Sequence, residues 1–214
     1  MLTTLTMRIE SLATGPDRAG RYAVRFSDGS VMRLYRQTVE DFGLYVGQEY
    51  TDSEYAALKT AAGAMSAKMR AVRIVAATSV SKSDLERRLV HKGEDPKQAQ
   101  EAVQWMSQLQ LVDDRRTAEQ IVERCAAKGY GVARAKQALY EKRIPKEYWD
   151  DVLENYPDQG EAIADYLRSH LGDSNDPKAL QKVLNALIRR GHSYGQIRSA
   201  LRQFSFDEEN IPED

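Results

Sequence analysis

The segment Leu85–Gly93, with the sequence LERRLVHKG, recurs twice further along the chain, as AKQALYEKR at 135–143 and as VLNALIRRG at 183–191. The first and fifth positions of every copy are apolar or small, which is the spacing of one helix face. The copies lie about 50 residues apart, and self-similarity at a fixed period is typical of repeat architectures. We therefore expect a helix in each copy, with a tight break at the position shared by Gly93, Arg143 and Gly191.

A second helix is predicted after each break. Six positions beyond it stand Ala99, Trp149 and Ile197, and four positions later stand Val103, Leu153 and Leu201. A further helical stretch precedes each pair, at 67–78, 117–128 and 161–171. Ser81 with Asp84, Asp95-Pro96 with Gln98, and Asp176-Pro177 have the chemistry of helix N-termini.

The repeating unit is thus three helices, used three times. Such a unit leaves an apolar face that its neighbour covers, so we expect a mainly α fold of three tandem three-helix repeats in an elongated, curved array. The predicted parts are an N-terminal β extension (1–50), a helical lead-in with repeat 1 (51–112), repeat 2 (113–157), repeat 3 (158–206) and an acidic tail (207–214).

Residues 1–50 alternate apolar and polar side chains with period two, as strands do. Leu5, Met7 and Ile9 mark one strand, and 22–26 and 31–35 mark two more. Asp28-Gly29 between the last two is a strong hairpin signal, because the turn needs positive φ. A small antiparallel sheet is predicted.

Two capping patterns follow this sheet. Thr38 to Asp41 suggests a short helix, and Thr51 with Glu54 forms a capping box that starts a longer one. We expect the longer helix to continue past Gly63, with a shared face made by four apolar side chains: Met65, Met69, Val72 and Val75.

The charge balance is nearly neutral, with 31 Lys and Arg against 32 Asp and Glu, so the chain as a whole is not a strongly basic nucleic-acid binder. The segment Asp207–Asp214 holds five acidic residues and no basic one, so a basic body precedes an acidic tail. The uncharged stretches are too short to span a membrane, no secretory signal is visible, and Cys125 is the single cysteine. We expect a cytoplasmic protein.

Enzyme chemistry finds little support in the sequence. His91, His170 and His192 lack metal-ligand spacing, and no phosphate-binding glycine loop is present, so no metal or cofactor is predicted. Cys125 shares a helix face with small and apolar residues, which favours a packing thiol. Asp113-Asp114 precedes a helical pattern and suits a helix cap. No catalytic residue is expected.

Basic residues gather on the first helix of each pair and just after its break. They are Lys82, Arg87, Arg88 and Lys92, then Arg134, Lys136, Lys142 and Arg143, then Lys182, Arg189 and Arg190. Such a set concentrates positive potential. It also fits a solvated helix face with local ion pairs, for example Asp84 with Arg88, and charge alone leaves both interpretations open.

The order of these motifs resembles the RecX family of recombinase regulators. The resemblance rests on LVDDRRTA at 111–118, KGYG at 128–131 with a basic helix after it, SDLERRL at 83–89 before Lys92-Gly93, and RRG at 189–191. It covers roughly residues 66 to 206, and the N-terminal strands resemble an extension found in some members. Tandem order makes this resemblance more specific than any one motif.

The resemblance implies a non-enzymatic regulator that binds the groove of the RecA filament on single-stranded DNA and restrains its recombinase, ATPase and co-protease activities. It further implies RecA as partner, with salt-sensitive DNA contact and a monomeric chain. The residues that it points to are Arg87, Arg88, Lys92, Arg115, Arg116, Arg124, Lys128, Tyr130, Arg134, Lys136, Arg189 and Arg190.

Two residue roles stay open, and two other classes of protein stand beside the recombinase regulator. Tyr130 could pack between repeats, and the arginines could contact either phosphates or carboxylates, since a guanidinium suits both. The helix-break-helix pairs could instead belong to a transcription regulator that reads the DNA major groove. A general helical scaffold for protein partners is the third possibility.

Overall fold

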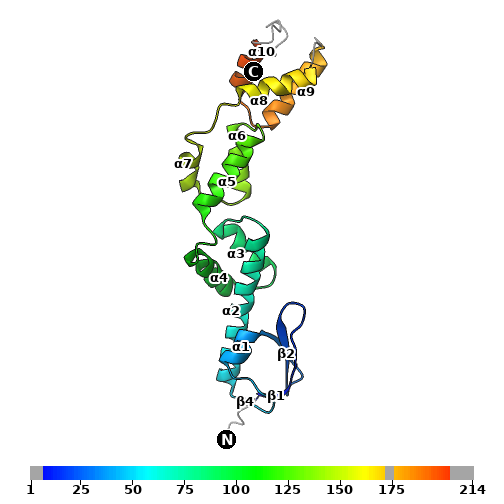
Figure 1. Ribbon diagram of the computed structural model, residues 1–214, viewed down its shortest axis with the longest axis vertical. Coiled ribbons are helices and arrows are strands. Elements are labelled where there is room, and N and C mark those ends of the chain that lie inside the picture. Colours follow the sequence, from blue (N-terminus) through cyan, green and yellow to red (C-terminus); the bar gives the residue numbers. More distant parts are fainter. Residues whose placement is uncertain (1–6, 172–175, 203–214) are drawn as a thin grey trace. The chain divides into compact units, whose positions relative to one another are not determined.

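The structure is a computed structural model that describes residues 7–171 and 176–202. It divides into two compact units, Met1–Val112 and Asp113–Asp214 (Figure 1). The expected fold class is confirmed, because the described residues form mainly helices beside one small antiparallel sheet. Within these residues no helix is long and apolar enough to cross a membrane. The predicted acidic tail and Leu5 lie outside the described residues.

The sheet of the first unit has four antiparallel strands in the order β3-β2-β1-β4. Their bounds are Met7–Leu12 (β1), Arg21–Phe26 (β2), Val31–Tyr35 (β3) and Glu49–Tyr50 (β4). The predicted hairpin joins β2 to β3, and Gly29 in its turn has φ of +83°. The Asp28 side chain accepts a hydrogen bond from the Ser30 N–H (2.8 Å) and fixes that turn. Strand β4 was not expected, because two residues carry no alternation.

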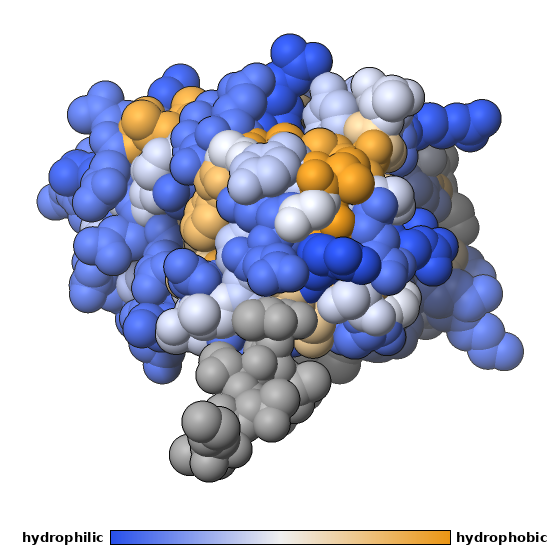
Figure 2. Space-filling model, turned by 90° about the horizontal axis from the view of Figure 1, so that it is seen from below, coloured by the Kyte–Doolittle hydropathy of each residue, from blue (hydrophilic) through white to orange (hydrophobic). Residues whose placement is uncertain are grey.

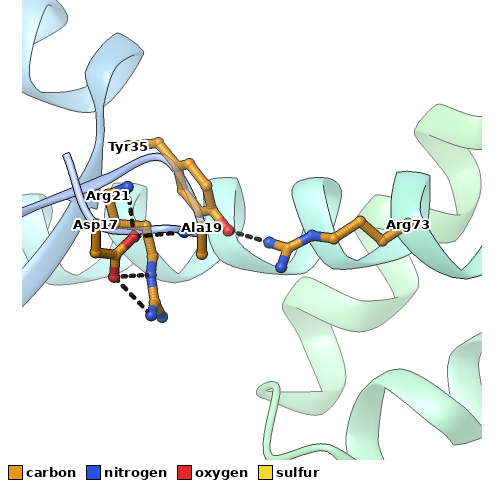
Figure 3. Close-up of polar contacts among 5 residues, drawn as sticks. All are labelled: Asp17, Ala19, Arg21, Tyr35 and Arg73. Atoms are coloured by element: carbon orange, nitrogen blue, oxygen red, sulfur yellow. Dashed lines mark hydrogen bonds and ion pairs between the residues drawn. The ribbon is translucent and has the colours of Figure 1, made fainter.

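One face of the sheet is buried against the start of helix α2 (Asp52–Ala77). Ile9, Val24 and Phe26 are fully buried, and the Phe26 ring meets the Tyr55 ring edge-on at 5.0 Å. At the end of β3, Arg73 of α2 donates a hydrogen bond to the Tyr35 hydroxyl (Figure 3). The sheet is thereby held to two places on the same helix.

The short helix α1 (Arg36–Asp41) directly follows β3. Its N-cap is Tyr35, without a side-chain capping bond, and Thr38 is buried inside the helix. The prediction that Thr38 starts a capping pattern is therefore wrong, because the strand runs into the helix without a loop.

Helix α2 begins at the predicted capping box, since Thr51 accepts from the Glu54 N–H and the Glu54 carboxylate accepts from the Thr51 N–H at 2.8 Å. Its buried residues over repeat 1 are Ala67 and Ala71, whereas Met65 is only partly buried. Of the predicted face, Val72 and Val75 do pack against the repeat 1 cluster, but Met65 and Met69 are not among the residues packed against it. Small residues face inward because α4 (Pro96–Gln108) packs very close, and a Cβ on Gly63 would lie 2.2 Å from Gln98 Oε1.

Repeat 1 is completed by α3 (Lys82–His91), which packs with α4 and the end of α2 around one apolar cluster. Ser81 caps α3 and accepts from the Asp84 N–H at 3.1 Å. Asp95 caps α4 with Pro96 at its first position. Both predicted helix starts are confirmed.

The second unit contains repeats 2 and 3. Repeat 2 comprises α5 (Asp114–Ala127), α6 (Val132–Glu141), the 3-10 turn η1 (Lys146–Tyr148) and α7 (Trp149–Leu153). Repeat 3 comprises α8 (Gly160–Leu171), α9 (Pro177–Arg189) and α10 (Tyr194–Arg202). The last helix of repeat 2 is short, because Pro145 leads into the 3-10 turn and the Trp149 indole N–H bonds back to the Ile144 carbonyl (3.1 Å).

The predicted alignment of the three breaks is confirmed by the backbone. Gly93, Arg143 and Gly191 all have left-handed φ, of +89°, +55° and +89°. The leucine four positions before each break is fully buried. After each break, the next N–H bonds to the carbonyl of that leucine, which is the Schellman closure of a helix.

Candidate functional site

Two of the predicted basic residues of unit 1, Arg87 and Arg88, bind one buried carboxylate. Arg87 and Arg88 bind the two oxygens of Asp84 at 2.7 and 2.8 Å. Burial raises the pKa of Asp84, but the hydrogen bonds from the two guanidinium groups outweigh it and bring that pKa below its usual value. The expected Asp84–Arg88 pair is thus present, and the Arg87 side chain is half-exposed. Lys92 caps the end of α3 and is exposed.

In unit 2, the end of α9 abuts the start of α6. The Gly131 N–H donates to the Arg190 carbonyl (2.9 Å), and the Ala133 N–H donates to the Gly191 carbonyl (3.3 Å). A Cβ on Gly131 would lie 2.0 Å from the Gly191 oxygen, and a Cβ on Gly191 would lie 2.3 Å from the Arg134 nitrogen. Glycine is required on both sides by this close backbone approach.

Two tyrosines flank Arg190 at this contact. Its guanidinium lies 5.1 Å from the Tyr130 ring centroid and 4.9 Å from that of Tyr166, within the range of cation–π attraction. Arg190 also donates to the Lys128 carbonyl at 3.3 Å. Tyr130 therefore packs between repeats 2 and 3, as one of the two sequence interpretations expected.

A shallow hollow opens at the same place. Its lining is drawn from α6, α8, α9 and the loop before α6, and consists of Tyr130, Arg134, Tyr166, Ala186, Arg189 and Arg190. We call Tyr130, Arg134, Tyr166, Arg189 and Arg190 the junction surface. Arg134 is half-exposed and shares an ion pair with Glu141 (3.2 Å), whereas Arg189 is exposed. Three guanidinium groups and two phenol rings can together hold an anionic, partly planar ligand.

The other predicted residues of repeat 2 lie apart from this hollow. Arg115 bridges Asp151 of α7 (2.6 Å) and Glu119 (3.3 Å). Lys136 borders a separate depression that it shares with Asp150, Asp151 and Glu154. Arg124 donates to the Gln120 carbonyl on its own helix (2.9 Å). The side chains of Arg116 and Lys128 are exposed.

Tyr166 is the member of the junction surface that the sequence did not indicate. It lies on the first helix of repeat 3, stacks on His170 at 3.9 Å, and reaches Arg190 only through the packing of α8 against the end of α9. Tyr166 is on α8 and Arg190 follows α9, so no regular spacing in the sequence indicates that the two side chains meet.

Asp113, Asp114 and Cys125 have structural roles. Asp113 caps α5 by accepting from the Arg116 N–H (3.1 Å), and Asp114 is buried in the first turn, as predicted. Cys125 is buried in the repeat 2 cluster, and burial raises the pKa of its thiol. Over the residues that the structure describes, no group of three or more His, Cys, Asp or Glu side chains is placed to hold a metal ion.

Tandem three-helix repeats beside a small sheet define this chain as a helical repeat protein. The family model "RecX, second three-helix domain" matches residues 113–153, which lie within repeat 2. Regulatory protein RecX of Halorhodospira halophila is 28% identical over 156 residues, covering 71% of this chain and 97% of that protein. Regulatory protein RecX of Vibrio parahaemolyticus is 26% identical over 155 residues, covering 71% and 98%.

Two crystal structures share the fold. One, of a regulatory protein RecX, has a TM-score of 0.64 at 20% identity and covers 92% of this chain and 99% of its own. The other, of RecX from Lactobacillus salivarius, has a TM-score of 0.57 at 19% identity and covers 67% and 97%. Together with the family model and the curated relatives, they confirm the resemblance to the RecX family of regulatory proteins.

Proposed function

We propose that this chain, acting as a monomer in the cytoplasm and without catalysing a reaction of its own, regulates the RecA recombinase. It binds the groove of the RecA filament on single-stranded DNA and lowers strand exchange, ATP hydrolysis and co-protease activity. The observation that carries the proposal is the match to RecX regulatory proteins over most of their length.

The junction surface is the part of unit 2 best suited to this contact. Its arginines present planar donor forks, which pair with carboxylates on a protein or with phosphates on DNA. Tyrosine and arginine are also the side chains that contribute most at protein interfaces. Because Arg190 is already engaged by two rings and a carbonyl, Arg134 and Arg189 are the members that would reach a partner.

The remaining predicted residues contribute to the proposed contact mainly through their charge. Arg87, Lys92, Arg116 and Arg124 are exposed cations on the helices, and they add positive potential that steers an anionic filament. Arg115 and Lys136 lie beside acidic side chains of α7, which reduces their contribution.

The test is RecA-dependent ATP hydrolysis on single-stranded DNA with increasing amounts of the purified chain. Wild type should inhibit at or below stoichiometric amounts. The variant Arg134→Gln/Arg189→Glu should need about thirtyfold more protein, since each of the two lost charged contacts costs roughly 1 kcal/mol.

A matched variant, Lys146→Glu/Arg198→Gln, makes the same change in charge in the same unit at exposed positions outside the predicted set. It should inhibit like wild type, and circular dichroism should show equal helicity for all three proteins. Lack of inhibition by wild type would refute the proposal. Tight binding to one operator sequence would instead indicate a transcription regulator, and inactivity in both assays would indicate a scaffold.

A further inference from the structure

The solvent-facing side of the N-terminal sheet carries a set of arginines that the proposed function does not use. Alternation along the strands directs Val24, Phe26 and Leu34 into the core. Their neighbours Arg25 on β2 and Arg33 on β3 therefore point outward, and both are exposed. Neither side chain has a hydrogen-bond or ion-pair partner among the residues that the structure describes.

The strand register places these two arginines close together. Arg25 lies opposite Val31, and Arg33 lies opposite Ala23, so the arginines are diagonal neighbours on the same face. Diagonal positions in an antiparallel pair are about 7–8 Å apart. Exposed Arg8 extends the row to β1, where its cross-strand partner is Glu49. We call Arg8, Arg25 and Arg33 the sheet arginines.

Most acidic residues of this segment have roles or partners other than Arg25 and Arg33. Asp17 binds Arg21 (2.9 Å), Asp28 closes the hairpin turn, and Glu54 caps α2. Glu40 and Asp41 lie on α1, and Asp52 starts α2. Glu10, at the irregularity of β1, is the acid nearest in sequence to the row. A segment with little net charge thus presents two unpaired guanidinium groups side by side.

The side chains between the sheet arginines are mostly small, and the end of the molecule that carries the sheet has a mostly hydrophilic surface (Figure 2). Ala23 and Ser11 stand next to Arg25 and Arg33, and half-exposed Val31 is the one large apolar side chain among these paired positions. A protein interface needs buried aromatic or aliphatic anchors at its centre, which this face lacks. Repeated guanidinium groups without anchors are the chemistry of phosphate contacts, which position a nucleic acid without reading its bases.

We propose that this face of the N-terminal sheet is a second binding surface, and that its ligand is the phosphate backbone of DNA. Arg25 and Arg33 contact successive phosphates, and Arg8 adds a weaker contact because Glu49 lies opposite it. Tyr35, which the register pairs with Arg21, is buried and hydrogen-bonded to Arg73, so no exposed ring stands beside Arg25 and Arg33 to stack on a base, and binding is independent of sequence.

The test uses the full chain and fluorescence anisotropy with a labelled 20-nucleotide strand and its duplex, without RecA, over a series of salt concentrations. The variant Arg25→Glu/Arg33→Glu should bind about tenfold more weakly. Losing two phosphate contacts should make the slope of log K against log salt shallower by roughly 1.4 on the single strand and 1.8 on the duplex.

The matched control is Lys97→Glu/Lys146→Glu, which changes the charge equally at exposed positions on α4 and η1. It should bind like wild type, and thermal unfolding should show that both variants keep their fold. An equal loss of DNA affinity in both variants would show that net charge alone explains the effect, and it would overturn the inference. Unchanged DNA binding by the arginine variant would overturn it as well. Because RecA is absent, neither result bears on the proposed regulation of the recombinase.

Discussion

The three breaks between paired helices have the same backbone but different surroundings. Around Gly93 a Cβ would meet nothing within 4 Å, whereas around Gly191 it would collide with the backbone of Arg134 at 2.3 Å. Arg143 adopts the same left-handed conformation with a full side chain. The repeat therefore specifies the backbone turn, and the neighbouring elements decide whether glycine is needed for its conformation alone or for space as well.

The residue after each break likewise has the same backbone role in all three repeats but a different side-chain environment. Glu94, Ile144 and His192 are all buried, and each donates its N–H to the leucine carbonyl of its own helix. Glu94 binds Arg70 at 2.5 Å, Ile144 joins an apolar cluster, and His192 bonds to the Gly129 carbonyl through Nε2 at 3.0 Å. One backbone position thus accommodates an ion pair, an apolar side chain and an imidazole.

The largest effect is expected from Gly191→Ala. The new methyl group must displace the backbone of α6, so unit 2 should lose about 3 kcal/mol of unfolding free energy. Urea unfolding followed by circular dichroism measures this loss. A change below about 1 kcal/mol would show that the contact with α6 is not tight.

A smaller loss, of about 1–2 kcal/mol, is expected from Gly93→Ala, because only the left-handed backbone opposes the side chain there. The same urea titration gives the comparison, run in a Trp149→Phe background so that Trp105 fluorescence reports unit 1 alone. Equal losses at Gly93 and Gly191 would contradict the distinction between conformation and space.

His192 should make unit 2 sensitive to mild acid. Burial lowers the pKa of His192 below its usual 6.5, the Gly129 hydrogen bond opposes this, and Arg190 adds to the lowering. The unfolded chain then binds a proton more readily than the folded one, so stability is full above pH 6.5 and falls as the pH drops through that value. His192→Gln should flatten the dependence of the urea midpoint between pH 7 and 5, and an unchanged profile would assign it to other groups.

The smallest effect, and one of opposite sign, is expected at Arg143. Arg143→Gly removes the strain of a left-handed residue but adds freedom to the unfolded chain, so a net gain of about 0.5 kcal/mol is expected. Thermal unfolding of the full chain with and without Arg143→Gly measures this gain in stability. A loss of stability would mean that the Arg143 side chain makes a stabilising contact.

Local chemistry made much of the fold predictable. The alignment of the breaks, the caps at Ser81, Asp95 and Asp176, and the capping box at Thr51 follow from interactions between residues close in sequence. On α2, Val72 and Val75 were placed correctly against the cluster, but Ala67 and Ala71 were missed because close packing favours alanine over methionine there. Tyr166 in the junction surface was also missed, since contacts between distant helices leave no spacing to detect.

The start of α6 is capped by another repeat. In α3, α4, α5 and α9, the side chain of the N-cap residue accepts a hydrogen bond from a backbone N–H of the first turn. Gly131, the N-cap of α6, has no side chain to do this. The Gly191 carbonyl accepts instead from the N–H of Ala133, the second residue of α6. Repeats 2 and 3 are therefore not interchangeable modules. The amide protons of Gly131 and Ala133, on repeat 2, should exchange with solvent at the rate at which repeat 3 opens, and they provide a natural reporter of its folding.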